Sequence, residues 1–145
     1  MVWKNPSPGE LAQDWIASRR IDPSGVDVDS CGHLAEFLLG DFPHEEPELT
    51  WQTILIVMRY YPTEDFFSEN ETEAQQVCGV LSAGPVEDLL SYHGDEYITR
   101  FEELAKSDQR MAWLLGGTWQ FRMSDEIWER VQQAGHHSYW ERRAN

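Results

Sequence analysis

Residues 27–32, Asp-Val-Asp-Ser-Cys-Gly, imitate the opening of a calcium-binding helix–loop–helix. The first, third and sixth positions of such a loop fit the pattern. The fifth position is Cys31, where an oxygen ligand is needed, and the twelfth is Leu38, where a bidentate glutamate is needed. The sequence therefore predicts no calcium site, and the segment is interpreted as the cap of a helix that ends at Gly40.

The cysteines and histidines do not supply enough suitably spaced ligands for a zinc site. Cys31 and His33 offer two ligands, but a structural zinc needs four and no second pair has a suitable spacing. Cys78 stands alone, and no glycine motif of the kind that builds an oxyanion site accompanies either cysteine. We expect two free thiols, no metal and no cofactor.

Glu87, Asp88 and His93 are the residues whose types and spacing fit general acid–base chemistry. On a helix that begins at residue 85, capping explains them as well, because carboxylates suit the first turn and a histidine suits the last. The aromatic and glycine segment from Trp113 to Trp119 predicts a tight corner where backbone and indoles approach closely. These five residues form one candidate pocket, and core packing is the other interpretation of the corner.

Acidic residues provide the second candidate site. Residues 41–73 carry nine carboxylates against one basic residue, Arg59. Such a surface attracts basic proteins, and the alternative interpretation is that it only keeps the protein in solution. The expected partner contacts are Asp41, Glu45, Glu46, Glu48, Glu64, Asp65, Glu69, Glu71 and Glu73.

The charge of the whole chain limits the classes of partner. The formal net charge of the 145 residues is −15, and residues 100–145 hold seven charges of each sign, so the excess lies in residues 1–99. This balance repels nucleic acid and anionic membranes. No apolar signal segment and no membrane-spanning run occurs, so we expect a cytoplasmic protein of unknown oligomeric state.

Helical periodicity and caps dominate the pattern, and no alternating strand pattern occurs. We therefore predict a single all-α domain, residues 1–145, built as an irregular bundle of about seven to eight short helices. Its acidic part is 1–99 and its charge-balanced, Trp-rich part is 100–145. Residues 54–57, Ile-Leu-Ile-Val, are expected to be fully buried. Helices are predicted to begin near residues 8, 27–30, 47, 64, 85, 95, 108 and 125, with a loop at 41–47, one long helix over 64–82 and a left-handed glycine at 94.

A series of fragments between residues 50 and 132 resembles a bacterial family catalogued only as a domain of unknown function. The fragments are Leu-Ser-Ala-Gly-Pro-Val-Glu-Asp-Leu-Leu at 81–90, His-Gly at 93–94, Leu-Gly-Gly-Thr-Trp at 115–119 and Ser-Asp-Glu-Ile-Trp-Glu-Arg-Val at 124–131. The resemblance implies a bacterial cytoplasmic protein, and it implies no activity, ligand or catalytic residue.

Three functions remain open from the sequence. The leading hypothesis is a non-enzymatic acidic binding protein, in concrete form an immunity or inhibitor protein that neutralises a basic macromolecular partner. The second is a small enzyme or ligand-binding domain that uses Glu87, Asp88 and His93 near the Trp113–Trp119 corner. The third is a structural subunit that oligomerises through its C-terminal half.

Overall fold

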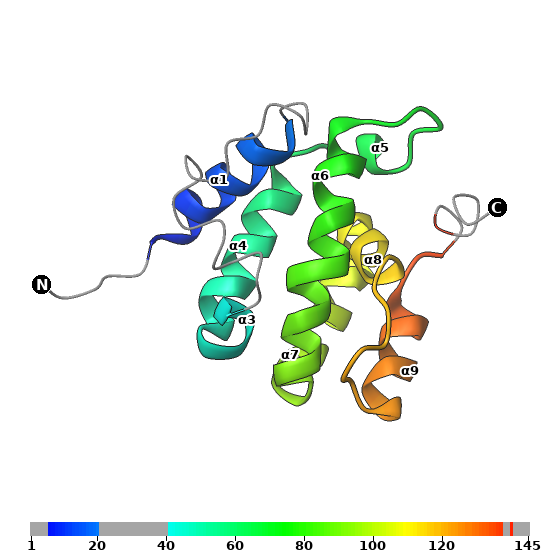
Figure 1. Cartoon of the computed structure of the whole chain (residues 1–145). Helices are drawn as coiled ribbons and strands as arrows, with labels where there is room; N and C mark the ends of the chain where they lie inside the picture. The colour runs from blue at the N-terminus through cyan, green and yellow to red at the C-terminus, as the bar shows by residue number, and fades with distance from the viewer. Residues whose placement is uncertain (1–5, 21–40, 138–139, 141–145) are drawn as a thin grey trace, which may run out of the picture.

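The computed structural model describes residues 6–20, 41–137 and 140, and the described residues form helices without any strand (Figure 1). The all-α prediction is confirmed for this part of the chain. The helix predicted before Gly40, the calcium-like segment and the Cys31–His33 pair lie outside the described residues. The elements are α1 (Pro8–Arg20), α3 (Asp41–Glu45), α4 (Pro47–Arg59), α5 (Thr63–Phe66), α6 (Glu73–Leu81), the π-helical turn η3 (Ser82–Val86), α7 (Glu87–Ser107), α8 (Gln109–Gly116) and α9 (Asp125–Ala134).

Polar side chains cap several helices at the positions where the sequence predicts that a helix begins. Ser7 Oγ accepts the backbone N–H of Glu10 at 3.1 Å, and the Glu10 carboxylate accepts the N–H of Ser7. Ser124 Oγ accepts the N–H of Ile127 at 3.2 Å, and the Asp108 carboxylate caps α8 in the same way. These bonds satisfy N–H groups that have no partner inside the helix, and so they fix where each helix begins.

Two predictions about the acidic region were wrong. Residues 41–45 form α3 rather than a loop, because Phe42 is buried and the short helix packs against α4 and α7. Residues 64–82 do not form one helix. The chain turns between α5 and α6, where Gln75 Nε2 donates to the carbonyl oxygens of Phe66 and Ser68, and Thr72 with Gln75 forms a capping box. The side-chain bonds of this polar stretch compete with a continuous helix.

The sequence predicts that a helix ends at Gly84-Pro85. In the structure α6 instead continues through η3 into α7. Pro85 has no N–H to donate, and the wider π-helical turn accommodates it. The predicted boundary between the helices that begin near residues 85 and 95 is present as a kink at His93, whose φ/ψ values of −133° and 34° are not helical, although the chain continues within α7. The left-handed glycine predicted at 94 was also wrong, because Gly94 lies within α7 and packs closely on Ile127. Together α6, η3 and α7 form one bent helical rod, which passes through the middle of the molecule (Figure 1).

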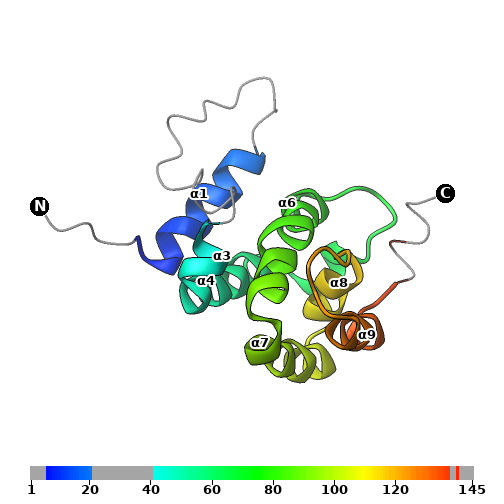
Figure 2. The same cartoon turned by 60° about the horizontal axis from the view of Figure 1, so that its bottom comes forward.

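The bent rod separates α1, α3 and α4 on one side from α8 and α9 on the other (Figure 2). Trp15 of α1 is fully buried, and its Nε1 donates to the carbonyl oxygen of Val77 in α6 at 3.1 Å. Residues 54–57 are mostly buried in α4, but Ile56 is 40% exposed, which corrects the prediction of complete burial. Among the residues that the structure describes, no helix combines the length and apolar character needed to cross a bilayer.

Candidate functional site

The end of α8 builds a tight corner at Gly116 and Gly117. Thr118 Oγ1 donates to the carbonyl oxygen of Leu115 at 2.8 Å, and this bond turns the chain out of the helix. Residues 117–124, here called the Trp119 loop, then cross the surface towards α9. Trp119 is 74% exposed and Phe121 is 61% exposed. Two large exposed rings on one loop beside a cavity mark a candidate interaction surface.

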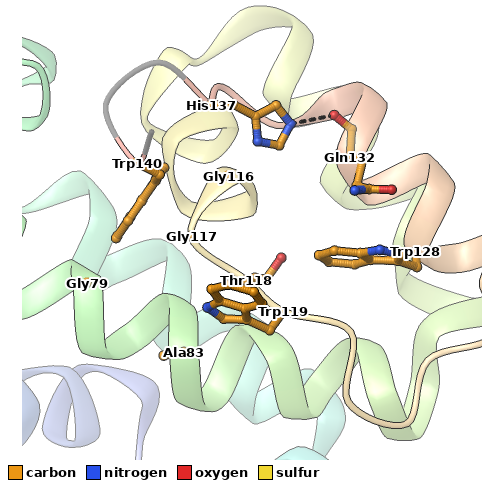
Figure 3. Close-up of a pocket in the computed structure, with 10 residues that line it drawn as sticks. All are labelled: Gly79, Ala83, Gly116, Gly117, Thr118, Trp119, Trp128, Gln132, His137 and Trp140. Atoms are coloured by element: carbon orange, nitrogen blue, oxygen red, sulfur yellow. Dashed lines mark hydrogen bonds between the residues drawn. The ribbon is translucent and has the colours of Figure 1, made fainter. Parts of the chain in front are cut away.

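Beside the Trp119 loop lies a cavity of about 500 Å³, here called the tryptophan pocket (Figure 3). Trp140 stands on one side of it and Trp128 on the other, with Trp119 between them and His137 across from Trp119. Its lining is completed by Gly79, Ala83, Gly116, Gly117, Thr118 and Gln132. A cavity of this size, lined by aromatic faces and a few polar groups, is typical of a binding site.

The two glycines are required by space rather than by backbone angles. A Cβ at Gly116 would lie 2.1 Å from the backbone oxygen of His136, and a Cβ at Gly117 would lie 2.4 Å from Cζ2 of Trp140. The close approach that the glycine pair predicts is therefore present. Trp113 is fully buried and packs edge-on against Phe66, so one end of the predicted aromatic cluster is core and the other end is surface.

Glu87 belongs to the same corner, although not in the role that capping suggests. Since η3 leads directly into α7, Glu87 and Asp88 do not lie at a free helix end. Glu87 Oε2 instead accepts the backbone N–H of Trp119 at 3.4 Å. Burial raises the pKa of Glu87; the bond from Trp119 lowers it, and the neighbouring Asp88 charge raises it again. Burial also raises the pKa of Asp88.

His93 faces a different neighbour. Its Nε2 lies 2.7 Å from the carbonyl oxygen of His44 in α3, and its Nδ1 lies 3.7 Å from a carboxylate oxygen of Glu96. Glu87 is six positions earlier, which is about 9 Å along a helix axis. Of the five residues predicted to share a pocket, Trp119 lines the tryptophan pocket, and Glu87 lies at its edge through the bond to Trp119. Trp113 is buried in the core, Asp88 is not a lining residue, and His93 contacts α3 instead.

The nine predicted contact carboxylates fall into two groups. One group lies on and after α3, the other on and after α5, and α4 separates them by about 20 Å of helix. The Glu48 carboxylate accepts hydrogen bonds from the guanidinium of Arg100 at 2.6 Å and from the hydroxyl of Tyr97 at 3.0 Å. Glu73 accepts the hydroxyl of Tyr61 at 2.6 Å. The exposed members are Asp41, Glu45, Glu48, Glu64, Glu69 and Glu71, and the half-buried ones are Glu46, Asp65 and Glu73.

Metal-ligating and nucleophilic groups do not gather in the described ranges. No set of three or more His, Cys, Asp or Glu side chains there could hold a metal ion. Cys78 is buried in α6, and burial raises the pKa of its thiol far above the ordinary value, which favours the unreactive protonated form.

Residues 35–139 match a family described as a family of unknown function, DUF6869. The chain belongs to this family. The match extends the resemblance noted over residues 50–132 in both directions, and it includes every residue that lines the tryptophan pocket except Trp140. No curated protein and no solved structure matches the chain.

Sequence reasoning missed half of the tryptophan pocket. Gln132, His137 and Trp140 come from α9 and the segment after it, and they reach the corner through the packing of α8 against α9. His136 N donates to the carbonyl oxygen of Ala112 at 2.8 Å, which brings this segment back to α8. One sequence signal was Trp128, which occupies an apolar position of the helix that follows the glycine pair. That spacing does not identify the residues that complete the pocket.

Proposed function

We propose that this domain is a non-enzymatic binding protein that holds a basic macromolecular partner on the face formed by the Trp119 loop and the tryptophan pocket. The observation that carries the proposal is the exposure of Trp119 and Phe121, 74% and 61%, at the edge of a cavity of about 500 Å³. Exposed aromatic anchors beside a preformed pocket are the usual centre of a protein interface. An inhibitor or immunity protein is the specific form that we favour.

The charge of the chain supports a basic partner. The net charge of −15 raises the rate at which a cationic protein encounters the domain, and the exposed carboxylates at both ends of α4 contribute to that attraction. The aromatic face supplies the close contact, and the acidic surface supplies the long-range attraction. The two features of the sequence thus have separate parts in one function.

The contacts of His93 make us prefer binding to acid–base catalysis. A catalytic base must come within hydrogen-bond reach of the group it serves. His93 is bound to α3 through the carbonyl of His44, whereas Glu87 is bound to the Trp119 loop. The two groups therefore support different parts of the fold.

The test is affinity capture from the native host followed by mass spectrometry. The tagged wild-type chain is compared with the double variant W119A/F121A and with Tyr60→Ala, in which another exposed aromatic ring is removed from the end of α4. We expect a protein of high isoelectric point to be enriched by the wild type and by Tyr60→Ala and lost with the double variant. Enrichment of the same proteins by all three chains would contradict the proposal, as would an acidic partner.

A further inference from the structure

Glu87 is a half-buried carboxylate that has no basic partner among the described residues. Its one hydrogen bond within the described residues comes from the backbone N–H of Trp119, and that bond occupies Oε2. Asp88 beside it has no hydrogen bond or ion pair with any described residue. Neither carboxylate lines the tryptophan pocket, but Glu87 lies at its edge through the bond to Trp119, and its Oε1 accepts no hydrogen bond from a described residue. Burying part of a carboxylate costs less when a cation pairs with it, so this edge favours a positive group.

The faces of the tryptophan pocket suit a flat cation. The indoles of Trp119, Trp128 and Trp140 line it, and the face of an indole ring attracts a cation within about 6 Å of its centre. The side-chain amide of Gln132 also lines the cavity and has no hydrogen-bond partner among the described residues. Its oxygen can accept an N–H from whatever enters.

The surrounding charges favour a positive ligand. Asp125, Glu126 and Glu129 are exposed on α9, next to the helical turn that carries Trp128. The cation of the Trp119 loop, Arg122, lies over the Phe121 ring, with its guanidinium carbon 5.2 Å from the ring centre, and so makes a cation–π contact within the loop. A carboxylate or phosphate ligand would meet this acidic surface at a cost, because like charges repel.

We propose that the tryptophan pocket binds one arginine side chain of the basic partner, with its guanidinium against the indole faces and its N–H groups towards Glu87 and Gln132. This inference rests on the proposed function and names the group that the partner inserts. Arginine fits better than lysine, because a planar guanidinium stacks on an aromatic face while it donates several hydrogen bonds in its own plane. The ammonium of lysine is more strongly hydrated and cannot stack.

The test uses three capped tripeptides, Gly-Arg-Gly, Gly-Lys-Gly and Gly-citrulline-Gly, added to the full-length ¹⁵N-labelled chain. Citrulline has nearly the shape of arginine but no charge. The signals are the indole N–H resonances of Trp119 and Trp128, assigned from the variants Trp119→Phe and Trp128→Phe. We expect the arginine peptide alone to shift these two resonances saturably at millimolar concentration. Glu87→Gln should weaken that binding about fivefold, the factor expected for a partly exposed ion pair, while Glu45→Gln on α3 leaves it unchanged.

Equal shifts with the citrulline peptide would overturn the inference, since they would show binding without charge recognition. Equal shifts with the lysine peptide would overturn the assignment to arginine. An absence of shifts with all three peptides at tens of millimolar would reject the pocket as the arginine site. The capture experiment separates this failure from failure of the proposed function, because a basic partner that is lost with W119A/F121A would still stand.

Discussion

The Nε1 of Trp140 donates a hydrogen bond of 2.9 Å to the backbone carbonyl oxygen of Trp113, 27 residues earlier. The two rings also pack with their centres 4.6 Å apart. This pair joins the last described residue to the middle of α8, and it places the Trp140 ring over Gly117 as one wall of the tryptophan pocket. The wall of the pocket formed by Trp140 therefore depends on this indole and on the absence of a side chain at Gly117.

Substitution of Gly117 by alanine should displace Trp140. The new Cβ would lie 2.4 Å from Cζ2 of the ring, so either the ring or the corner must move. We expect the free energy of unfolding to fall by roughly 1–3 kcal/mol, the usual cost of overpacking. Chemical denaturation followed by tryptophan fluorescence measures both the stability and the change around Trp140.

Gly79→Ala is the matched control, because its Cβ would approach the same ring at 3.8 Å, which is an ordinary contact. Gly79 lies inside α6, where alanine is favoured over glycine by roughly 1 kcal/mol. This variant should be as stable as the wild type or slightly more so. Equal destabilisation by both substitutions would contradict the assigned position of the Trp140 ring.

Local features of the sequence predicted the starts of α1, α4, α8 and α9, whereas the start of α6 and the continuation of α6 into α7 were not predicted. The caps at Ser7 and Ser124 involve atoms three residues apart, and their chemistry is visible in the sequence. The break between α5 and α6 combines the local capping box of Thr72 and Gln75 with a distant contact, since the Phe66 ring packs edge-on against Trp113 at 5.2 Å. Periodicity alone cannot report a contact across 47 positions, so residues 64–82 read as a single helix.

The candidate site shows the same division. The glycine pair at 116–117 predicted a close approach, because only glycine leaves room for another atom at its Cβ position. Which group fills that room follows from the packing of α8 on α9, and so Trp140 was not predicted. His93 was grouped with Glu87 by spacing, but the kink at His93 turns it towards α3.

The pair of Glu102 and Arg130 should make stability depend on acid. Hydrogen bonds from Arg130, one of them 3.0 Å from its Nε to Oε2, lower the pKa of Glu102. A carboxylate whose folded pKa is lowered adds stability above its unfolded pKa, and this is lost as the pH falls through the folded value. Glu102→Gln should therefore cost up to about 1 kcal/mol at pH 7, and the difference should close at acidic pH.

Urea denaturation at several pH values checks this expectation. Glu103→Gln is the control, because Glu103 meets Lys106 at 3.2 Å with both side chains largely exposed. Such a pair contributes little, and its removal should leave the pH profile almost unchanged. A gap between the wild type and Glu102→Gln that persists at low pH would show that the substitution acts through packing rather than charge.

Glu87 should behave in the opposite way. Burial raises its pKa, so the ionised side chain is disfavoured in the folded state and reduces stability once the pH exceeds the unfolded value. Glu87→Gln keeps an oxygen that accepts the N–H of Trp119, and it should be at least as stable as the wild type at pH 7. The difference should shrink as the pH falls through the raised pKa, since the wild-type carboxyl is then neutral as well. Glu45→Gln, at an exposed position, serves as the control in the same denaturation series.

The two acidic groups at the ends of α4 should act independently on association with the basic partner. They are separated by about 20 Å of helix, which exceeds the distance of roughly 8–10 Å over which exposed charges are screened at physiological salt. Neutralising either group should leave folding intact, because self-repulsion is relieved.

The comparison uses two triple variants, D41N/E45Q/E46Q and E64Q/D65N/E69Q, in stopped-flow mixing with the captured partner. Each variant should slow association, and added salt should slow the wild type in the same direction, because both changes weaken long-range attraction. If the groups are independent, the combined variant should slow association by the product of the two separate factors. Dissociation should change little, since close contact is assigned to the aromatic face. An association rate that neither salt nor these substitutions alter would leave the carboxylates a role in solubility only, and the variants would then differ from the wild type in aggregation alone.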